Sequence, residues 1–133
     1  MEETIFTKIV KGEIPCYKIA EDENFFAFLD ISPIAKGHTL VITKLQNDYI
    51  FDLPDELLGK MMVFAKKIAV AVKSAIPCNR VGVAVIGIDV PHNHIHLVPI
   101  NGVGDLNFKA PRVQLSEDEF KEIAAKISAA VEL

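Results

Sequence analysis

The sequence contains little cysteine, no excess of basic residues and no long apolar run. Cys16 and Cys78 are its only cysteines, too few for a disulfide framework or a four-cysteine zinc site, and they favour a reducing compartment. The formal net charge of −4 argues against an extended nucleic-acid-binding surface, although a single nucleotide phosphate needs only local donors. No apolar stretch approaches the roughly 20 residues of a membrane span, and the acidic first residues lack the layout of a signal peptide. We therefore expect a cytoplasmic protein that binds neither a nucleic acid polymer nor a membrane.

The distribution of apolar and turn-forming residues predicts one α+β domain in this chain of 133 residues. Clusters of aromatic and β-branched residues predict strands over 17–20, 25–29, 38–43, 81–86 and 92–100. A long helix is expected over 54–75, because its apolar residues recur with helical spacing and Pro77 ends the run. Ser116 and Glu119 have the spacing of a capping box and predict a C-terminal helix. Because only one long helix separates the two groups of strands, we expect a mainly antiparallel sheet.

Three of the four histidines are concentrated in the stretch His92-Asn93-His94-Ile95-His96. Side chains alternate between the two faces of a strand, so the three imidazoles are predicted to project from one face. Crowded imidazoles all need polar partners, which favours a functional role over a structural one. Two kinds of chemistry fit. The histidines could bind a metal ion, or one neutral imidazole could attack a substrate while its neighbours orient it.

The stretch over 92–98 resembles the signature of the histidine triad family of nucleotide hydrolases and transferases, His-φ-His-φ-His-φ-φ with φ apolar, and departs from it only at Asn93. Residues 4–15 and 28–42 resemble the opening and the second and third strands of the same family, in the same order. The resemblance implies a five-stranded sheet and a single domain over 1–133, with a core of about 4–108 and a helical extension over about 109–133. It also implies a homodimer in which the two sheets join into one.

The resemblance further implies the chemistry of a nucleoside phosphoramidase or related hydrolase that needs no cofactor or metal. His94 falls on the family's nucleophile, which attacks the α-phosphorus of a purine nucleoside monophosphate derivative and forms a nucleotidyl-histidine intermediate. His96 would donate to the phosphate oxygens, His92 would orient His94, and His38 would lie against the triad.

The stretches over residues 4–15 and 28–42 also contain the nucleoside site that the resemblance implies. Five apolar residues match positions that enclose the base in the family: Ile5, Phe6, Ile9, Phe28 and Ile31. Asp30 matches the carboxylate that accepts hydrogen bonds from the ribose hydroxyls.

The loop before the triad departs from the family pattern. Typical hydrolases carry Gly-Gln-Ser or Gly-Gln-Thr there, whereas this chain has Gly87, Ile88 and Asp89. Gly87 can still be aligned with the phosphate-binding glycine. Asp89 replaces the hydroxyl residue near the leaving group, where it could act as an acid or simply form a turn. This change supports a second hypothesis, a nucleotide-binding regulatory dimer with weak catalysis, and a histidine-ligated metal enzyme is a third.

A zinc-binding subgroup of the family carries two cysteines near the N-terminus and a histidine after the third strand. Thr4, Thr7 and Gln46 occupy those places in this sequence, so the zinc of that subgroup is not expected. The segment 101–112 directly follows the triad strand and could cover the leaving-group side or reach a partner subunit.

Overall fold

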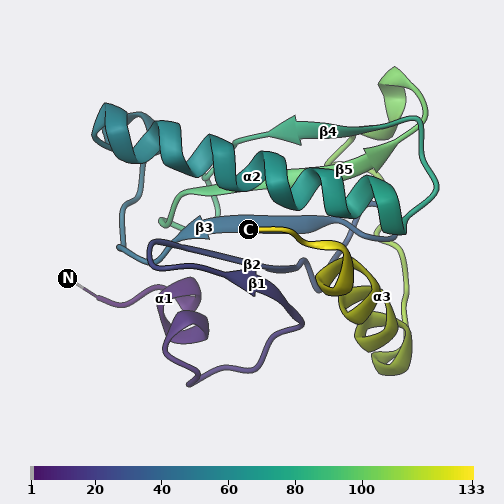
Figure 1. Cartoon of the computed structure of the whole chain (residues 1–133), viewed down its shortest axis with the longest axis horizontal. Coiled ribbons are helices and arrows are strands. Elements are labelled where there is room, and N and C mark those ends of the chain that lie inside the picture. Colours follow the sequence, from purple (N-terminus) through teal and green to yellow (C-terminus); the bar gives the residue numbers. More distant parts are fainter. Residues whose placement is uncertain (1) are drawn as a thin grey trace.

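The computed structural model describes residues 2–133 of the chain. Its elements follow one another as α1 (Ile5–Val10), β1 (Lys18–Glu21), β2 (Phe25–Leu29), β3 (Thr39–Thr43), the 3-10 turn η1 (Ile50–Asp52), α2 (Asp55–Ala75), β4 (Arg80–Ala84), β5 (His94–Ile100), the 3-10 turn η2 (Val103–Asp105) and α3 (Glu117–Ala130). The five strands pair antiparallel in the order β1-β2-β3-β5-β4, which confirms the predicted α+β fold (Figure 1).

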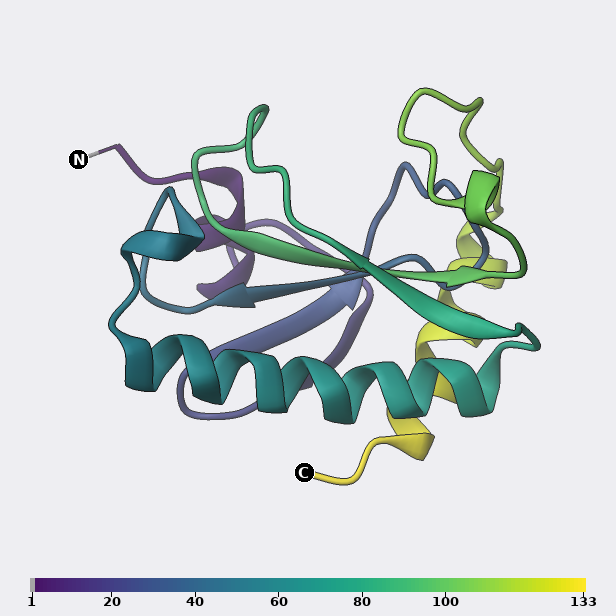
Figure 2. The ribbon, with the colours of Figure 1, turned by 90° about the horizontal axis from the view of Figure 1, so that it is seen from above.

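Helices α2 and α3 cover one face of the sheet, and the main core lies beneath them (Figure 2). The strands supply alternate residues to this core, such as Phe25, Ala27 and Leu29 from β2, as expected for side chains that point to opposite faces in turn. Ile95 and Leu97 of β5 also point toward the helices. The remaining side chains of these strands therefore face away from α2 and α3.

The opposite face carries a smaller apolar cluster, which is covered by the short helix α1. Phe26 and Phe28 of β2 pack there with Phe6 and Ile9 of α1. His94 and His96 alternate with Ile95 and Leu97, so their imidazoles lie on this α1 face. The triad and the apolar cluster thus share one side of the sheet.

Four strands differ from their predicted limits, β1 and β3 by one residue at an end and β5 and β4 by up to two. β5 begins at His94, so His92 precedes the strand that was predicted over 92–100. The backbone N–H of His92 donates to Val90 O in a turn, and that of Asn93 donates to Asn47 O, which prevents a regular ladder before His94. The imidazole of His92 still lies beside Phe6, on the same side of the sheet as His94. β4 likewise ends at Ala84, two residues earlier than predicted.

The two long helices agree closely with the prediction. α2 runs to Ala75 and buries Met61 and Ile68, and α3 begins after Ser116 with the predicted capping box to Glu119. Within residues 2–133, none of the helices is both long enough and apolar enough to span a bilayer.

Candidate active site

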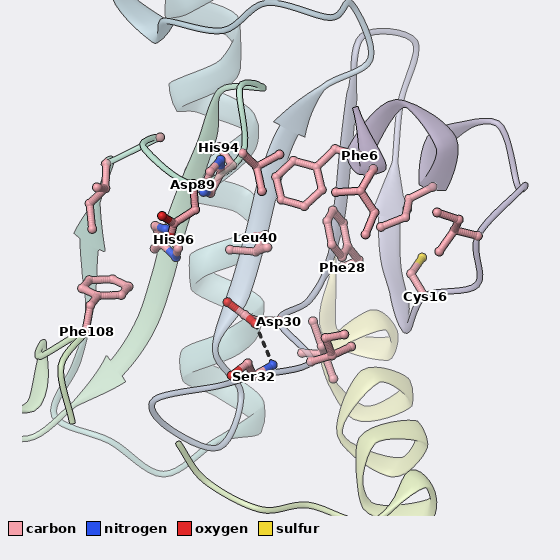
Figure 3. Close-up of a pocket in the computed structure, with 18 of the residues that line it drawn as sticks. Phe6, Cys16, Phe28, Asp30, Ser32, Leu40, Asp89, His94, His96 and Phe108 are labelled. Atoms are coloured by element: carbon pink, nitrogen blue, oxygen red, sulfur yellow. Dashed lines mark hydrogen bonds between the residues drawn. The ribbon is translucent and has the colours of Figure 1, made fainter. Parts of the chain in front are cut away.

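A cavity of about 460 Å³ opens on the α1 face of the sheet, beside the triad (Figure 3). Its walls come from α1, the turn after β2, the loop between β4 and β5, β5 itself and the segment that follows η2. All residues predicted to hold the nucleoside line it, namely Ile5, Phe6, Ile9, Phe28, Asp30, Ile31 and Gly87. Three predicted catalytic residues line it as well: His94, His96 and Asp89. His38 and His92 lie behind these, at 1% and 0% exposure.

One end of the cavity is apolar and aromatic. The rings of Phe6 and Phe28 meet edge to face with centroids 5.6 Å apart, and Phe6 also lies 5.1 Å from the ring of His94. Figure 3 shows Phe6 and Phe28 on one side of the cavity and His94 and His96 on the other. A flat apolar group bound against Phe6 and Phe28 would therefore lie close to the imidazole of His94.

The hydrogen bond of His94 defines its tautomer. Its Nδ1 lies 2.8 Å from the main-chain oxygen of His92, and a carbonyl oxygen can only accept, so Nδ1 carries the proton. In the neutral ring Nε2 is then unprotonated and holds an electron pair. Since His94 lines the cavity, this arrangement fits a nucleophile or a metal ligand.

His92 is held by a buried network that reaches α1. Its Nε2 lies 2.7 Å from Thr43 O and must donate, so Nδ1 accepts from the Thr4 hydroxyl at 2.8 Å. The Thr4 hydroxyl also accepts from the backbone N–H of Thr7 and so caps α1. Burial lowers the pKa of His92, which keeps the ring neutral in this network. The orientation of His92 is therefore coupled to the start of helix α1.

Thr4, Thr7 and Gln46, which stand where the zinc-binding subgroup has its ligands, meet around His92. Gln46 Oε1 accepts from the Thr7 hydroxyl at 2.7 Å and from the Thr4 backbone N–H at 3.0 Å. Neutral hydroxyls and an amide are not the thiolate and imidazole ligands that zinc prefers, and their hydrogen bonds already satisfy one another. The residues present do not fit zinc, and the network itself takes the place of a metal in joining these segments.

His38 and His96 form a second hydrogen-bonded pair. The backbone N–H of Ile34 donates to His38 Nδ1 at 3.1 Å, so His38 Nε2 carries a proton and donates to His96 Nδ1 at 2.9 Å. The neutral His96 ring must then carry its proton on Nε2, as a hydrogen-bond donor. Burial lowers the pKa of His38 to about 3 and that of His96 to about 4, so both rings are neutral at pH 7.

Asp30 lines the cavity and is the first residue after β2. Its Oδ1 accepts from the backbone N–H of Ser32 at 2.8 Å (Figure 3). Its Oδ2 lies 3.6 Å from Nε2 of His38. Burial raises the pKa of Asp30, while the Ser32 hydrogen bond and the charge of Arg112 oppose that rise. One carboxylate oxygen is thus left to accept from a bound ligand.

Asp30, His38 and His96 are also the described residues that come nearest to a metal site, with potential ligand atoms within 4.8 Å of one another. The hydrogen bond between His38 and His96 occupies the electron pair of His96 Nδ1, and the Ile34 N–H occupies that of His38 Nδ1. A metal would have to break this pair, so the geometry favours acid–base and nucleophilic chemistry over ligation.

The loop between β4 and β5 forms the remaining wall. Gly87 has a φ of 70°, in the left-handed region that glycine adopts without strain, and Ile88 is 82% exposed. Asp89 lines the cavity together with His94 and His96, and Figure 3 shows its side chain at the histidine end. The loop therefore places one exposed carboxylate, Asp89, and the exposed side chain of Ile88 in the wall of the cavity that also contains the histidines.

Phe108 and Arg112 are among the residues that line the cavity without having been predicted as site residues. Phe108 lies with its ring centroid 4.7 Å from that of His96, and Arg112 lines the same end. Both belong to the segment 101–112, which was expected to cover the site or reach a partner. Their contacts join parts of the chain far apart in sequence, and the segment carried no pattern that could predict them.

Residues 11–102 of this chain match the sequence pattern of the HIT domain family. The chain therefore belongs to the histidine triad (HIT) family, whose fold and triad it carries. The adenosine 5′-monophosphoramidase of Schizosaccharomyces pombe is 36% identical to it over 131 residues, which cover 96% of this chain and 97% of the relative.

Solved structures of the family superpose well on the whole chain. A HIT-like protein from Bartonella henselae, described as involved in cell-cycle regulation, is 32% identical, with a TM-score of 0.83 and 97% of each chain covered. A zinc-bound histidine triad family protein from Mycobacterium smegmatis is also 32% identical, with a TM-score of 0.81, and covers 95% of this chain and 91% of its own.

Proposed function

We propose that this HIT protein is a nucleotide hydrolase of the phosphoramidase type. It would cleave a phosphoramidate or phosphoanhydride at the α-phosphorus of a purine nucleoside monophosphate derivative. The observation that carries the proposal is the electron pair of His94 Nε2, which lies in a cavity between an aromatic slot and a donor nitrogen of His96. The similarity to an adenosine 5′-monophosphoramidase supports the same substrate class.

The substrate fits the two ends of the cavity. The base would lie among Ile5, Phe6, Ile9, Phe28 and Ile31. Asp30 would accept hydrogen bonds from the ribose hydroxyls with its free oxygen, and the phosphate would reach the histidines and Gly87. Slots of this kind bind flat apolar rings by burial, with a few polar groups to fix the orientation.

In the first step His94 Nε2 forms a bond to the α-phosphorus, and the bond from phosphorus to the leaving nitrogen or oxygen breaks. The positive imidazole that results keeps its Nδ1–H on the His92 oxygen, which stabilises the charge. His96 Nε2–H would donate to a non-bridging phosphate oxygen. Asp89 would act as the general acid and give a proton to the leaving group.

In the second step water attacks the same phosphorus and gives its proton to the Asp89 carboxylate. The bond between phosphorus and Nε2 breaks, its electron pair returns to His94, and the nucleoside monophosphate leaves. His38 and His92 touch neither reacting atom and act through His96 and His94. Dividing one displacement into two steps lowers the barrier for each.

The experiment that tests the proposal is hydrolysis of adenosine and guanosine phosphoramidates, with a chelator present, by the parent and by His94→Ala. Chelator-resistant turnover that disappears in the variant supports a covalent histidine mechanism. Nucleotide binding without turnover by the folded parent would instead identify a regulatory nucleotide-binding protein, which the replacements at Ile88 and Asp89 favour. Activity lost on chelation would identify a metal enzyme.

We also propose that two copies join their sheets through β4. β4 lies at an edge of the sheet, where its outer backbone groups are unpaired, and Val83 and Val85 are 50% and 42% exposed. Antiparallel pairing of two β4 strands about a two-fold axis would cover both residues and make one continuous sheet.

Both cysteines are free thiols, in keeping with the cytoplasmic location that we expect.

A further inference from the structure

The segment after η2 folds back over the polar end of the cavity and is fixed there by main-chain contacts. The backbone N–H of Val113 donates to Pro33 O at 2.8 Å, and Phe108 packs on His96. Between them, the guanidinium of Arg112 donates from Nη1 to Ser32 O at 3.2 Å and from Nη2 to Phe108 O at 3.0 Å. The side chain is thus held between the turn after β2 and its own segment.

Arg112 is the one lysine or arginine among the described residues that line the cavity. The same lining contains two carboxylates, Asp30 and Asp89. Because His96 is neutral at pH 7, it offers a dipole and no charge. A phosphate at the triad would meet a site with no net positive charge apart from this guanidinium.

The charge of Arg112 is felt at the reactive end. It opposes the rise of the Asp30 pKa and contributes to the lowered pKa values of His38 and His96. A guanidinium has five N–H donors, and the two carbonyl contacts leave three of them for a ligand. The carbonyls also fix the orientation of the fork, which reduces the entropy lost on binding.

We propose that Arg112 is a binding residue of the nucleotide site, whose guanidinium recognises the charge of the 5′-phosphate and so separates a nucleoside monophosphate from a nucleoside. The inference rests on the proposed function, because it requires the phosphate to lie at the triad end of the cavity. A purely structural role, a clamp between the C-terminal segment and the turn after β2, is the alternative. The two roles differ in which affinity falls when the charge is removed: that for the nucleoside monophosphate alone, or that for the nucleoside as well.

The test is calorimetric titration of AMP and of adenosine into the parent, Arg112→Gln, Arg112→Lys and Lys109→Gln. Arg112→Gln should weaken AMP binding by about 10- to 100-fold, since hydrogen bonds to charged groups are among the strongest. Adenosine binding should change by less than about twofold, because it brings no charge. Arg112→Lys should recover part of the loss. Lys109→Gln removes an exposed charge from the same segment outside the cavity and should leave both affinities unchanged.

Three results would overturn the inference. Equal weakening of AMP and adenosine by Arg112→Gln would identify a structural clamp. Unchanged AMP binding would mean that the guanidinium does not meet the phosphate. If the parent itself bound AMP no better than adenosine, the fault would lie with the proposed function, because the phosphate would not be recognised by any residue of the site.

Discussion

Nε2 of His38 lies 2.9 Å from Nδ1 of His96, and the donor in this hydrogen bond is His38. The direction is fixed from outside the pair, by the backbone N–H of Ile34 on the other nitrogen of His38. His96 is thereby obliged to present an N–H rather than an electron pair at Nε2. His38, which does not line the cavity, thus determines that His96 presents a hydrogen-bond donor and not an acceptor at Nε2.

The lowered pKa values of this pair predict that stability falls in mild acid. Unfolded histidines take up protons near pH 6.5, whereas folded His38 and His96 do so only near 3 and 4. Between those values the unfolded state binds more protons, so the free energy of unfolding decreases as the pH falls from about 6.5 to about 4. Urea unfolding at pH 7.5, 6, 5 and 4.5 measures this.

Replacing His38 by glutamine removes one of the buried imidazoles whose pKa is lowered and should reduce that pH slope. The variant will itself be less stable at pH 7.5, so the slope and not the absolute stability is compared. An unchanged slope in His38→Gln, or a parent whose stability is flat from pH 7.5 to 4.5, would contradict the assigned neutral state.

Thr4→Val should destabilise the protein by about 1–3 kcal/mol, because it removes the side-chain N-cap of α1 and the hydroxyl that donates to the buried Nδ1 of His92 at 2.8 Å. Valine has nearly the size of threonine, so the loss reports the hydroxyl and not a cavity. Chemical denaturation measures the free energy of unfolding. Thr4→Ser keeps the hydroxyl and should retain most of the stability, and the network would be unimportant if valine and serine behaved alike.

Asp89→Asn should slow hydrolysis in a manner that depends on the leaving group. General acid catalysis contributes about 100-fold or more when the departing group is a strong base, as an alkylamine is. A leaving group that needs no proton, such as a phosphate from an anhydride, should be released at nearly the parental rate. The measurement is kcat/KM for both substrates. Equal loss for the two would show that Asp89 has another role, such as shaping the loop.

Val83→Lys should separate the proposed dimer, because it would place two like charges across the two-fold axis where β4 strands meet. Light scattering after gel filtration gives the mass of the parent and variant. Val103→Lys is the control for an added exposed charge, since Val103 is 99% exposed and lies in η2, outside the sheet. A parent that is monomeric, or a Val83→Lys variant that stays dimeric, would exclude pairing through β4.

The sequence allowed the elements to be predicted where local pattern decides the structure. β2 has the predicted limits, and the α3 capping box is confirmed. Phe64 of α2 is buried, and its ring packs against that of Phe25 in β2 with centroids 5.5 Å apart. That contact joins distant segments, and periodicity within one helix cannot reveal it.

The candidate site could likewise be predicted from the sequence only in part. Spacing alone placed His94 and His96 on one face, and the resemblance to the family selected the residues that the fold then gathers around the cavity. His92 was assigned to the strand, but a turn and a bond to Asn47 shape the backbone there. Arg112 reaches the cavity through two carbonyls supplied by other parts of the chain, so its position follows from tertiary structure.

The network of Thr4, Thr7, Gln46 and His92 bears on how such a centre can change in evolution. Thr4 and Gln46 each take part in several of its hydrogen bonds, so any single replacement by a cysteine or histidine breaks contacts at once. Such a step does not yet assemble the four ligands that a structural zinc site requires. Each intermediate should therefore be less stable than either end point. A change from the metal-free network to a zinc site therefore passes through less stable proteins, unless the residues at Thr4, Thr7 and Gln46 are all replaced together.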